Sequence, residues 1–398
     1  MFEHVVAFPG DPILTLNEDF LKDPRADKIN LSIGVYLDEA GRLPLMDSVL
    51  KAETAILGAP GSRPYLPMEG APNYRKEVQH LLFGNEHPAV VDSRIATVQT
   101  IGGSGALKVG ADFLAANFRQ SAVWVCDPTW DNHLSIFGRA GFQVFRYPYY
   151  DAKTHHVDFK ALQASLEKIP AGDIVLLHAC CHNPTGADLT EQQWRELAII
   201  IRTRSLLPFF DIAYQGFGSG IDDDAFAIRH FSSEGIACLV ASSFSKNLSL
   251  YGERCGALHI VCDTAGQARN VLGQLKGTVR CNYSSPPTHG SRIVTMVLES
   301  SALRAEWERD LNKMRARLVT MREGLHAALH SRRPDVDFSY LLQQKGMFSF
   351  TGLTPVQIRR LREEFGIYLI ESGRICIAAL TQKAIQPLAD AMAQIIER

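Results

Sequence analysis

The chain has 398 residues, which is too long for one simple core and suits two domains, or one large and one small domain. With 46% hydrophobic and 21% charged residues, its composition is that of a globular protein and excludes a disordered or fibrous class. Because 41 Lys and Arg nearly balance 43 Asp and Glu, the charge does not favour nucleic acid or an acidic membrane surface, and small molecules are the expected ligands.

The N-terminus and the cysteines indicate where the chain resides. Met1 to His4 lacks the basic and apolar regions of a signal peptide, and no stretch of eighteen residues is apolar without a charge. The eight cysteines form no CxxC pair, so they do not indicate a disulfide-stapled secreted domain. We therefore expect a cytoplasmic chain with free thiols and no membrane segment.

Short apolar runs alternate with helical patterns between residues 95 and 262, which is typical of an α/β domain with a mainly parallel sheet. Strands are predicted at residues 95–100, 122–126, 174–178, 207–211, 239–243 and 256–261. Several of these runs end in polar or glycine-rich residues. Open α/β sheets bind their ligands at such strand ends, so the sequence predicts a site there.

An amphipathic pattern without proline runs from residue 301 to 331 and predicts a helix long enough to bridge two domains. A smaller α+β unit is expected after it, with a helix at 355–365 and short strands at 346–350, 367–370 and 374–378. The N-terminal segment is expected to pack with this unit. We thus expect a large domain over residues 45–312 and a small domain made of 1–44 and 313–398.

A glycine-rich turn, Gly102-Gly103-Ser104-Gly105, lies between a predicted strand and a predicted helix. The first amides of that helix are suited to bind a phosphate, which the helix dipole also favours. Lys108 occupies the third glycine position of a dinucleotide-binding fingerprint, and the GK[ST] end of a P-loop is missing. The turn is therefore a phosphate-cup candidate, and a purely structural turn is the alternative.

Histidines and cysteines follow the predicted strand at 174–178. If the strand continued, alternation would place His178, Cys180 and His182 on one face, where three metal ligands are geometrically possible. The alternative is a core histidine whose hydrogen bonds are satisfied, and we favour it because no fourth ligand is found nearby.

Asp211 ends the apolar run Leu206 to Phe210, and Tyr214 follows three residues later. A buried carboxylate needs a cationic or donor partner. A pyridinium nitrogen is such a partner, and Tyr214 and Asn183 would then donate to the phenolate oxygen of the same ring. A strand-end aspartate that caps the next helix is the alternative.

Lys246 directly follows a predicted buried strand in the segment Ser243-Phe-Ser245-Lys246, and Arg254 lies eight residues later. Desolvation lowers the pKa of a buried lysine and makes its neutral amine available as a nucleophile toward a carbonyl. Two hydroxyls and a guanidinium close to it are suited to hold a phosphate. A lysine that extends to the surface is the alternative.

Two arginines are candidates for binding a carboxylated substrate. Arg374 begins a predicted strand of the small domain, and Arg280 precedes the segment at 282–287. The planar fork of arginine matches a carboxylate bidentately, so two of them near one site suit a substrate with one or two carboxylates. Either residue is otherwise a plain surface arginine.

Taken together, these segments resemble the fold-type-I aminotransferases, specifically the aspartate aminotransferase subgroup and within it the bacterial aromatic amino-acid (tyrosine) aminotransferases. The resemblance covers essentially the whole chain. The motifs that carry it lie at residues 10–14 (GDPIL), 30–36 (NLSIGVY), 65–70 (YLPMEG), 102–107 (GGSGAL), 127–130 (DPTW), 182–186 (HNPTG), 211–216 (DIAYQG), 243–246 (SFSK), 251–254 (YGER) and 282–287 (NYSSPP).

The resemblance implies a large domain with a seven-stranded, mainly parallel sheet, a smaller α+β domain, and pyridoxal 5'-phosphate as cofactor. Lys246 then forms the Schiff base with the cofactor and afterwards moves a proton between Cα and C4'. Asp211 pairs with the pyridinium, His178 supports Asp211, and no metal is implied. The catalytic residues are therefore Lys246, Asp211 and Tyr214.

Further roles follow from the same resemblance. The remaining cofactor-binding residues are Gly103, Ser104, Ser243, Ser245 and Arg254 at the phosphate, Trp130 stacked on the ring, Tyr214 and Asn183 at its oxygen, and Tyr65 from a neighbouring subunit. Substrate is bound by Arg374 at the α-carboxylate, by the neighbour's Arg280 at a distal carboxylate, and by Gly34, Trp130 and Asn183. Because two subunits share each site, a homodimer is implied.

Substrate choice depends on a few positions. Ser104 and Ser285 match the aromatic enzymes, whereas Val35 matches the aspartate-selective ones. Apolar residues at other positions suit a pocket that accepts rings; they are Leu37, Leu43 and Pro64. We therefore predict a ping-pong aminotransferase that takes aromatic and dicarboxylic amino acids with 2-oxoglutarate. The alternatives are an aspartate-selective aminotransferase, a cofactor-dependent lyase on the same fold, a non-catalytic ligand-sensing module and a zinc-dependent enzyme.

Overall fold

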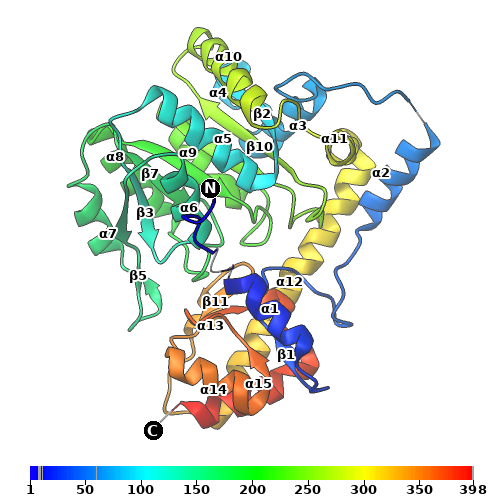
Figure 1. Ribbon diagram of the computed structural model, residues 1–398, viewed down its shortest axis with the longest axis vertical. Coiled ribbons are helices and arrows are strands. Elements are labelled where there is room, and N and C mark those ends of the chain that lie inside the picture. The colour runs from blue at the N-terminus through cyan, green and yellow to red at the C-terminus, as the bar shows by residue number, and fades with distance from the viewer. Residues whose placement is uncertain (8–9, 11, 60, 397–398) are drawn as a thin grey trace.

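The structure, a computed structural model, describes residues 1–7, 10, 12–59 and 61–396 (Figure 1). Its centre is a seven-stranded sheet in the order β2-β10-β9-β8-β7-β3-β4. The strands are β2 (Ile95–Ile101), β3 (Val123–Asp127), β4 (Val144–Pro148), β7 (Ile174–His178), β8 (Leu207–Ile212), β9 (Cys238–Ser243) and β10 (Cys255–Val261). Neighbours from β9 to β4 pair in parallel, and β10 is antiparallel to both β9 and β2. The predicted seven-stranded, mainly parallel sheet is confirmed.

The six predicted strands agree with the structure to within one residue at each end. The seventh strand, β4, was not predicted. Its residues are mostly exposed or half-buried, so it lacks the apolar run that marked the others. This is the edge position of the sheet, where one side of the strand has no neighbour.

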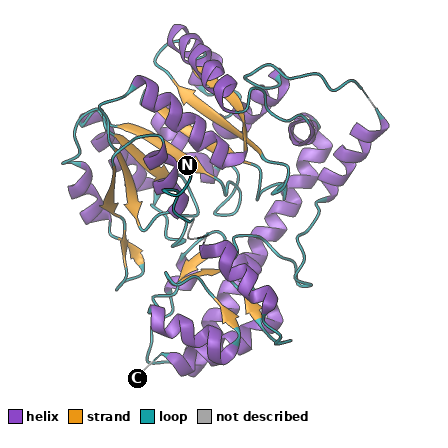
Figure 2. Cartoon of the chain, in the orientation of Figure 1, coloured by secondary structure: helices purple, strands orange, loops and turns teal. Residues whose placement is uncertain are grey.

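Both faces of the sheet are covered by helices, as Figure 2 shows. In β7, Ile174 and Leu176 join one core cluster while Val175 and Leu177 join another, because successive side chains of a strand point to opposite faces. The first face carries α5 (Gly102–Asn117), α6 (Asp131–Arg139) and α10 (Ala265–Asn282). The second face carries α3 (Pro72–Phe83), α8 (Glu191–Thr203) and α9 (Phe226–Ser233). The remaining helices of this body are α2 (Asp47–Gly58), α4 (Pro88–Val91), α7 (Phe159–Leu166) and α11 (His289–Glu299).

Helix α12 (Ser301–Arg332) runs from this body into a second group of elements (Figure 1). Near its beginning the buried Trp307 donates from Nε1 to the carbonyl of Asn247, at 2.6 Å. Farther along, the buried Arg322 donates to the carbonyl of Phe348, at 2.6 Å. The helix is therefore tied to both groups of elements.

The second group is a small α+β unit. It contains α13 (Tyr340–Gln343), β11 (Phe348–Phe350), α14 (Pro355–Phe365), β12 (Ile367–Tyr368), β13 (Arg374–Cys376) and α15 (Ile385–Ile395). The N-terminal segment adds α1 (Pro12–Lys22) and β1 (Ile29–Asn30), and β1 pairs in parallel with β12. The expected packing of the N-terminal segment with this unit is thus seen. A short hairpin of β5 (Tyr150–Asp151) and β6 (His156–Val157) completes the strands described.

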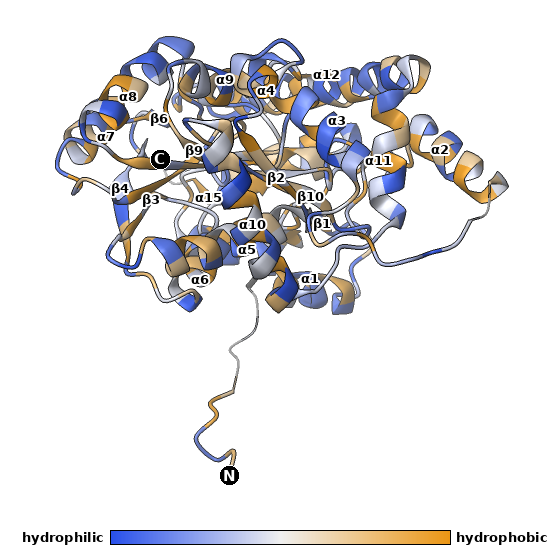
Figure 3. Cartoon of the chain, turned by 90° about the horizontal axis from the view of Figure 1, so that it is seen from above, coloured by the Kyte–Doolittle hydropathy of each residue, from blue (hydrophilic) through white to orange (hydrophobic). Residues whose placement is uncertain are grey.

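Figure 3 shows the apolar strands enclosed between helices, with the first residues of the chain extending away from the body. Residues 1–7 are exposed. Among the described residues, no helix combines the length and the apolar character needed to cross a membrane.

Candidate active site

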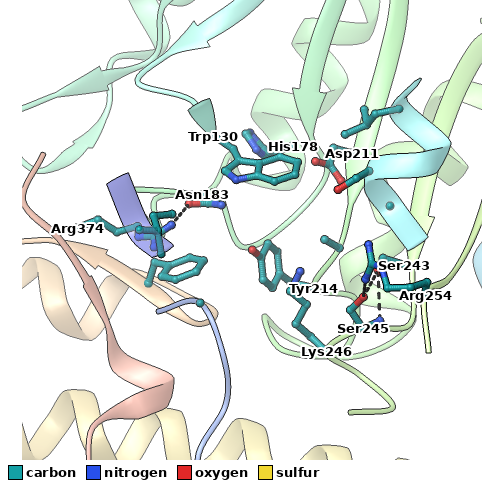
Figure 4. Close-up of a pocket in the computed structure, with 17 residues that line it drawn as sticks. Trp130, His178, Asn183, Asp211, Tyr214, Ser243, Ser245, Lys246, Arg254 and Arg374 are labelled. Carbon is teal, nitrogen blue, oxygen red and sulfur yellow. Dashed lines mark hydrogen bonds between the residues drawn. The ribbon is translucent and has the colours of Figure 1, made fainter. Parts of the chain in front are cut away.

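A pocket lies where β7, β8 and β9 end, against the small α+β unit (Figure 4). This is the edge at which open α/β sheets bind ligands. The predicted site residues that line it are Gly34, Gly103, Ser104, Trp130, Asn183, Asp211, Tyr214, Ser243, Ser245, Lys246, Arg254 and Arg374. The other lining residues are Ile13, Leu107, His178, Ala213 and Phe348. Residues far apart in the sequence therefore meet at one pocket.

One end of the pocket is a cationic cup. Arg254 Nη1 donates to Ser245 Oγ at 3.3 Å, and Ser243 Oγ donates to Ser245 Oγ at 3.2 Å. The first turn of α5 faces the same place. The amide of its first residue, Gly102, donates to the carbonyl of Arg254 at 3.1 Å, but the N-cap residue Ile101 has no side-chain acceptor, so the amides of Gly103 and Ser104 can serve a ligand. Gly102 has a φ of +66°, and a Cβ there would lie 2.8 Å from Arg254 Nη2. Guanidinium, hydroxyls and amides together suit a phosphate.

Asp211 is fixed by a residue that the sequence did not reveal. His133 Nε2 donates to Asp211 Oδ2 at 2.9 Å, and Thr129 Oγ1 lies 2.8 Å from His133 Nδ1. Burial alone raises the pKa of Asp211, but the hydrogen bond from His133 and the surrounding charges outweigh it and hold that pKa below its ordinary value. Asp211 is therefore an ionised carboxylate facing the pocket, ready for a cationic partner.

Lys246 is half-buried and lines the pocket, and its Nζ lies 5.1 Å from the ring centre of Tyr214. Burial lowers its pKa from 10.5 to about 8; the carboxylate of Asp211 opposes this shift, and Arg254 and Arg374 add to it. A substantial fraction of the amine is thus neutral near pH 8. Burial also raises the pKa of Tyr214, which therefore stays a phenol that donates a hydrogen bond.

Arg374 lies at the opposite end of the pocket from Arg254 (Figure 4). Its Nη1 donates to Asn183 Oδ1 at 3.2 Å and its Nη2 to the carbonyl of Ser32 at 2.7 Å. The guanidinium also lies 4.3 Å from the ring centre of Phe348. These contacts orient a buried fork toward the pocket and join the two groups of elements, and Ser32 and Phe348 were not predicted as part of the site.

The arrangement considered for a metal at His178, Cys180 and His182 is wrong. Strand β7 ends at His178, so the alternation on which it rested does not continue to His182. The side chain that meets His178 and His182 is Cys126, from β3. His178 lines the pocket near Asp211, but the hydrogen bond that supports Asp211 comes from His133.

Two predicted residues lie outside this pocket. Tyr65 is 94% exposed, and Arg280 is exposed and hydrogen-bonded to Ser284. Both were expected to serve a neighbouring subunit, so their place in a site stays a prediction. Asp11 of the motif at residues 10–14 lies outside the described residues.

The donor set fits pyridoxal phosphate. A primary amine, an ionised carboxylate and a phosphate cup surround one pocket, and these match the aldehyde, the ring nitrogen and the phosphate of that cofactor. The indole of Trp130 and the phenol of Tyr214 lie on opposite sides of the centre (Figure 4). The chain can therefore hold a planar, phosphorylated, cationic ring.

Comparisons with known proteins agree with this chemistry. A family model described as aminotransferase class I and II matches residues 26–392. The chain is 54% identical over 397 residues to an aromatic-amino-acid aminotransferase of Escherichia coli (strain K12) and 46% identical over 396 residues to an aspartate aminotransferase of the same organism, each covering 100% of both chains. A crystal structure of an aromatic-amino-acid aminotransferase from Burkholderia pseudomallei, covalently bound to pyridoxal phosphate, is similar with a TM-score of 0.98 and 49% identity, covering 100% of both chains.

Proposed function

The chain belongs to the class I and II aminotransferases, and we propose that it transfers amino groups between aromatic or dicarboxylic L-amino acids and 2-oxoglutarate by a ping-pong mechanism. One observation carries this proposal. The amine of Lys246 and the carboxylate of Asp211 line one pocket that has a guanidinium at each end. An amine, a charge partner for a ring nitrogen, and binders for a phosphate and a carboxylate are the groups that this reaction needs.

Pyridoxal phosphate, when bound, supplies an electron sink for the electron pair of the substrate Cα–H bond. Lys246 is the amine that holds its aldehyde. The Nζ of Lys246, when not bonded to the cofactor, would accept the proton from the substrate Cα. A pKa lowered to about 8 suits this task, because the amine is neutral often enough to take a proton and basic enough to hold it.

Asp211 keeps the ring nitrogen protonated. The hydrogen bond from His133 contributes by favouring the charged carboxylate over the neutral acid. Tyr214 and Asn183 would donate to the ring oxygen, and Trp130 would stack on the ring. These residues all line the pocket, which supports the assignment.

The phosphate is held by the cup at the start of α5. Arg254 supplies a charge-assisted hydrogen bond, and Ser243 and Ser245 supply hydroxyl donors. The amides of Gly103 and Ser104 add the positive end of the helix dipole. The cup thus anchors the cofactor while Lys246 exchanges with the substrate.

Arg374 binds the α-carboxylate of every substrate, and Gly34, at the pocket wall, leaves room beside it. A Cβ at Gly34 would lie 3.1 Å from the ring of Phe348, so a larger residue would crowd the pocket. The distal carboxylate of aspartate or 2-oxoglutarate is bound by Arg280 of a second copy, and Tyr65 of that copy adds to the phosphate cup. Their exposure on the isolated chain supports a homodimer with shared sites.

The preference for aromatic substrates is supported by the relatives and by Ser104 at the pocket wall. Ser285 donates to the carbonyl of Leu66 at 2.8 Å, away from this chain's own pocket, so it would act on the neighbour's site. Leu37 is half-buried, whereas Leu43 and Pro64 are exposed. An aspartate-selective enzyme, which Val35 favours, remains the second candidate because aspartate aminotransferases are also close relatives.

We further propose that the large domain spans residues 45–312 and that 1–44 with 313–398 form the small one, since β1 pairs with β12. A cytoplasmic location is supported by the cysteines: Cys281 is exposed, the other seven are buried, and all eight are free thiols.

The visible absorption spectrum tests the reaction and its substrate class. Phenylalanine added to the purified holoenzyme should bleach the coloured band, and 2-oxoglutarate should restore it. Aspartate added to a fresh sample should also bleach it. If aspartate alone bleaches the band, the enzyme is aspartate-selective. If Lys246→Ala retains activity within about tenfold of the wild type, the assigned proton transfer is wrong, because such transfer is generally worth about 10²- to 10⁴-fold.

Mixing two variants that are each impaired with aspartate tests whether two chains share each site. Lys246→Ala lacks the amine of its own site, and Arg280→Ala lacks the arginine that it gives to the neighbour. In a mixed two-fold dimer, one of the two sites is then intact, so random reassortment should restore about a quarter of the sites when aspartate is the substrate. If Arg280 acted within its own chain, no mixture would recover activity.

A further inference from the structure

Behind the active site, three buried side chains direct metal-ligating atoms toward one another. Cys126 Sγ lies 3.1 Å from His182 Nε2 and 3.6 Å from His178 Nδ1. The three ligand atoms are all within 4.8 Å of one another, and each residue is at most 8% exposed. The cluster joins the end of β3 to the end of β7, and the reaction proposed above does not use it.

The ring of His182 is held as the ring of a metal ligand usually is. Its Nδ1 lies 2.8 Å from Thr185 Oγ1, which leaves Nε2 directed at the sulfur. Tyr149 stacks on the ring, with centroids 4.1 Å apart and planes at 15°. Histidines that bind metals typically use one ring nitrogen for the ion and the other for such an outer hydrogen bond.

The thiol of Cys126 can donate its one proton to one of the two ring nitrogens and accept a hydrogen bond from the other. All three groups of the cluster are therefore directed at one point. His178 Nε2, which does not face the sulfur, is buried and has no hydrogen-bond partner among the described residues.

We propose that Cys126, His178 and His182 form a site for Zn²⁺ or a similar borderline-soft divalent ion. With usual zinc–sulfur and zinc–nitrogen bond lengths, a tetrahedral ion separates its sulfur and nitrogen ligands by about 3.5 Å. The observed separations of 3.1 and 3.6 Å lie close to this value. Three protein ligands leave the fourth position open, as in zinc sites that bind water.

Binding of the ion would deprotonate the thiol of Cys126. The S–H bond of Cys126 is replaced by a sulfur–metal bond, and the proton leaves to solvent. The ion and its thiolate together add one positive charge beside His178. The ligand atoms of His178, His133 and Asp211 also lie within 4.8 Å of one another, so this charge acts on the carboxylate that pairs with the cofactor. A positive charge there makes the Asp211 carboxylate less basic and disfavours a protonated ring nitrogen, so we expect the ion to inhibit the enzyme.

His178 also lines the active-site pocket, so the cluster lies directly behind that pocket (Figure 4). The test uses the holoenzyme incubated with Zn²⁺ to equilibrium. Zinc affinity is measured by competition with a coloured chelator, and Cd²⁺ is used as a second probe because a cadmium–thiolate bond absorbs in the ultraviolet. The variants are Cys126→Ser and His182→Gln, and Cys281→Ser is the matched control because Cys281 is the exposed thiol.

The proposal requires one zinc ion per chain in the wild type and in Cys281→Ser, with activity falling as the site fills. Cys126→Ser and His182→Gln should each bind zinc at least about tenfold more weakly, since even outer partners of a ligand typically contribute that much. Equal affinity in Cys126→Ser and the wild type would overturn the site. Loss of the cadmium absorbance in Cys281→Ser, with its retention in Cys126→Ser, would also overturn it. Zinc bound at Cys126 without loss of activity would overturn the coupling to Asp211.

Discussion

Replacing Arg374 tests the binding of the α-carboxylate, which all amino-acid substrates share, separately from the binding of the distal carboxylate, which only dicarboxylic substrates carry. Arg374 is 4% exposed and lines the pocket, and two of its nitrogens donate to Asn183 and Ser32. Removing one partner of a buried charge pair costs about 2–5 kcal/mol. At 1.36 kcal/mol per factor of ten, Arg374→Ala should lower kcat/KM about 30- to 5,000-fold for phenylalanine and aspartate alike.

The assay compares kcat/KM for the two amino acids in four proteins. Arg374→Lys keeps the charge without the planar fork, so its loss should be smaller than that of Arg374→Ala. Arg280→Ala should lower kcat/KM for aspartate and leave phenylalanine nearly unchanged, because phenylalanine has no distal carboxylate. The reasoning is refuted if Arg280→Ala lowers kcat/KM for phenylalanine as much as for aspartate, or if Arg374→Ala spares either amino acid.

Stability must be measured in parallel. Arg374→Ala also leaves the buried oxygen of Asn183 and the carbonyl of Ser32 without this donor. Each such buried group costs about 1–3 kcal/mol when its partner is removed. The thermal midpoint should therefore fall, and kinetics are compared at a temperature at which both proteins are folded. A normal visible band in the variant shows that the cofactor site is intact.

Three further predictions concern the cofactor. Gly102→Ala places a side chain at positive φ against Arg254, so it should lower stability by about 1–2 kcal/mol in urea unfolding and weaken cofactor retention on dialysis. His133→Phe removes a hydrogen bond to a charged group worth about 1.5–3 kcal/mol. The pKa of Asp211 should therefore rise, so activity should be lost at a higher pH on the acid side; an unchanged acid limb would contradict this. In the cofactor-free protein, the rate at which pyridoxal phosphate restores the coloured band should rise with pH and level off above about 8, the pKa of Lys246, rather than near 10.5. A rate that still climbs about tenfold per pH unit well above 8 would exclude a depressed pKa.

The central sheet could be predicted because its strands are buried on both faces and therefore appear as apolar runs. In β7 every residue is buried, and its bounds were predicted without error. β4 could not be found in this way, since only one of its five residues is buried. The site residues at strand ends were predicted for a topological reason, because the carboxyl ends of parallel strands meet at one edge.

The support of Asp211 could not be read from the sequence. His133 lies 78 positions before Asp211, and the two meet only because β3, β7 and β8 pair in parallel and α6 starts directly beyond β3. The segment 127–130 in front of α6 was the available signal, since it indicated that a site element begins there. The contact of Cys126 with His178 and His182 was not predicted for a similar reason. Cys126 lies on β3, more than 50 residues before these histidines, whereas Cys180 lies between them in the sequence.

The long helix α12 is hydrogen-bonded near its beginning to the segment that carries Lys246 and farther along to the small unit. Asn247 is the residue after Lys246, whereas Arg322, about 22 Å farther along the helix axis, is hydrogen-bonded to Phe348. A rotation of α12 by about 5° around Trp307 would move Arg322, and Phe348 with it, by about 2 Å. The distance across the pocket between Lys246 and Phe348 would then change with the angle of this one helix, so we expect substitutions along the buried side of α12 to alter substrate range without contacting the substrate.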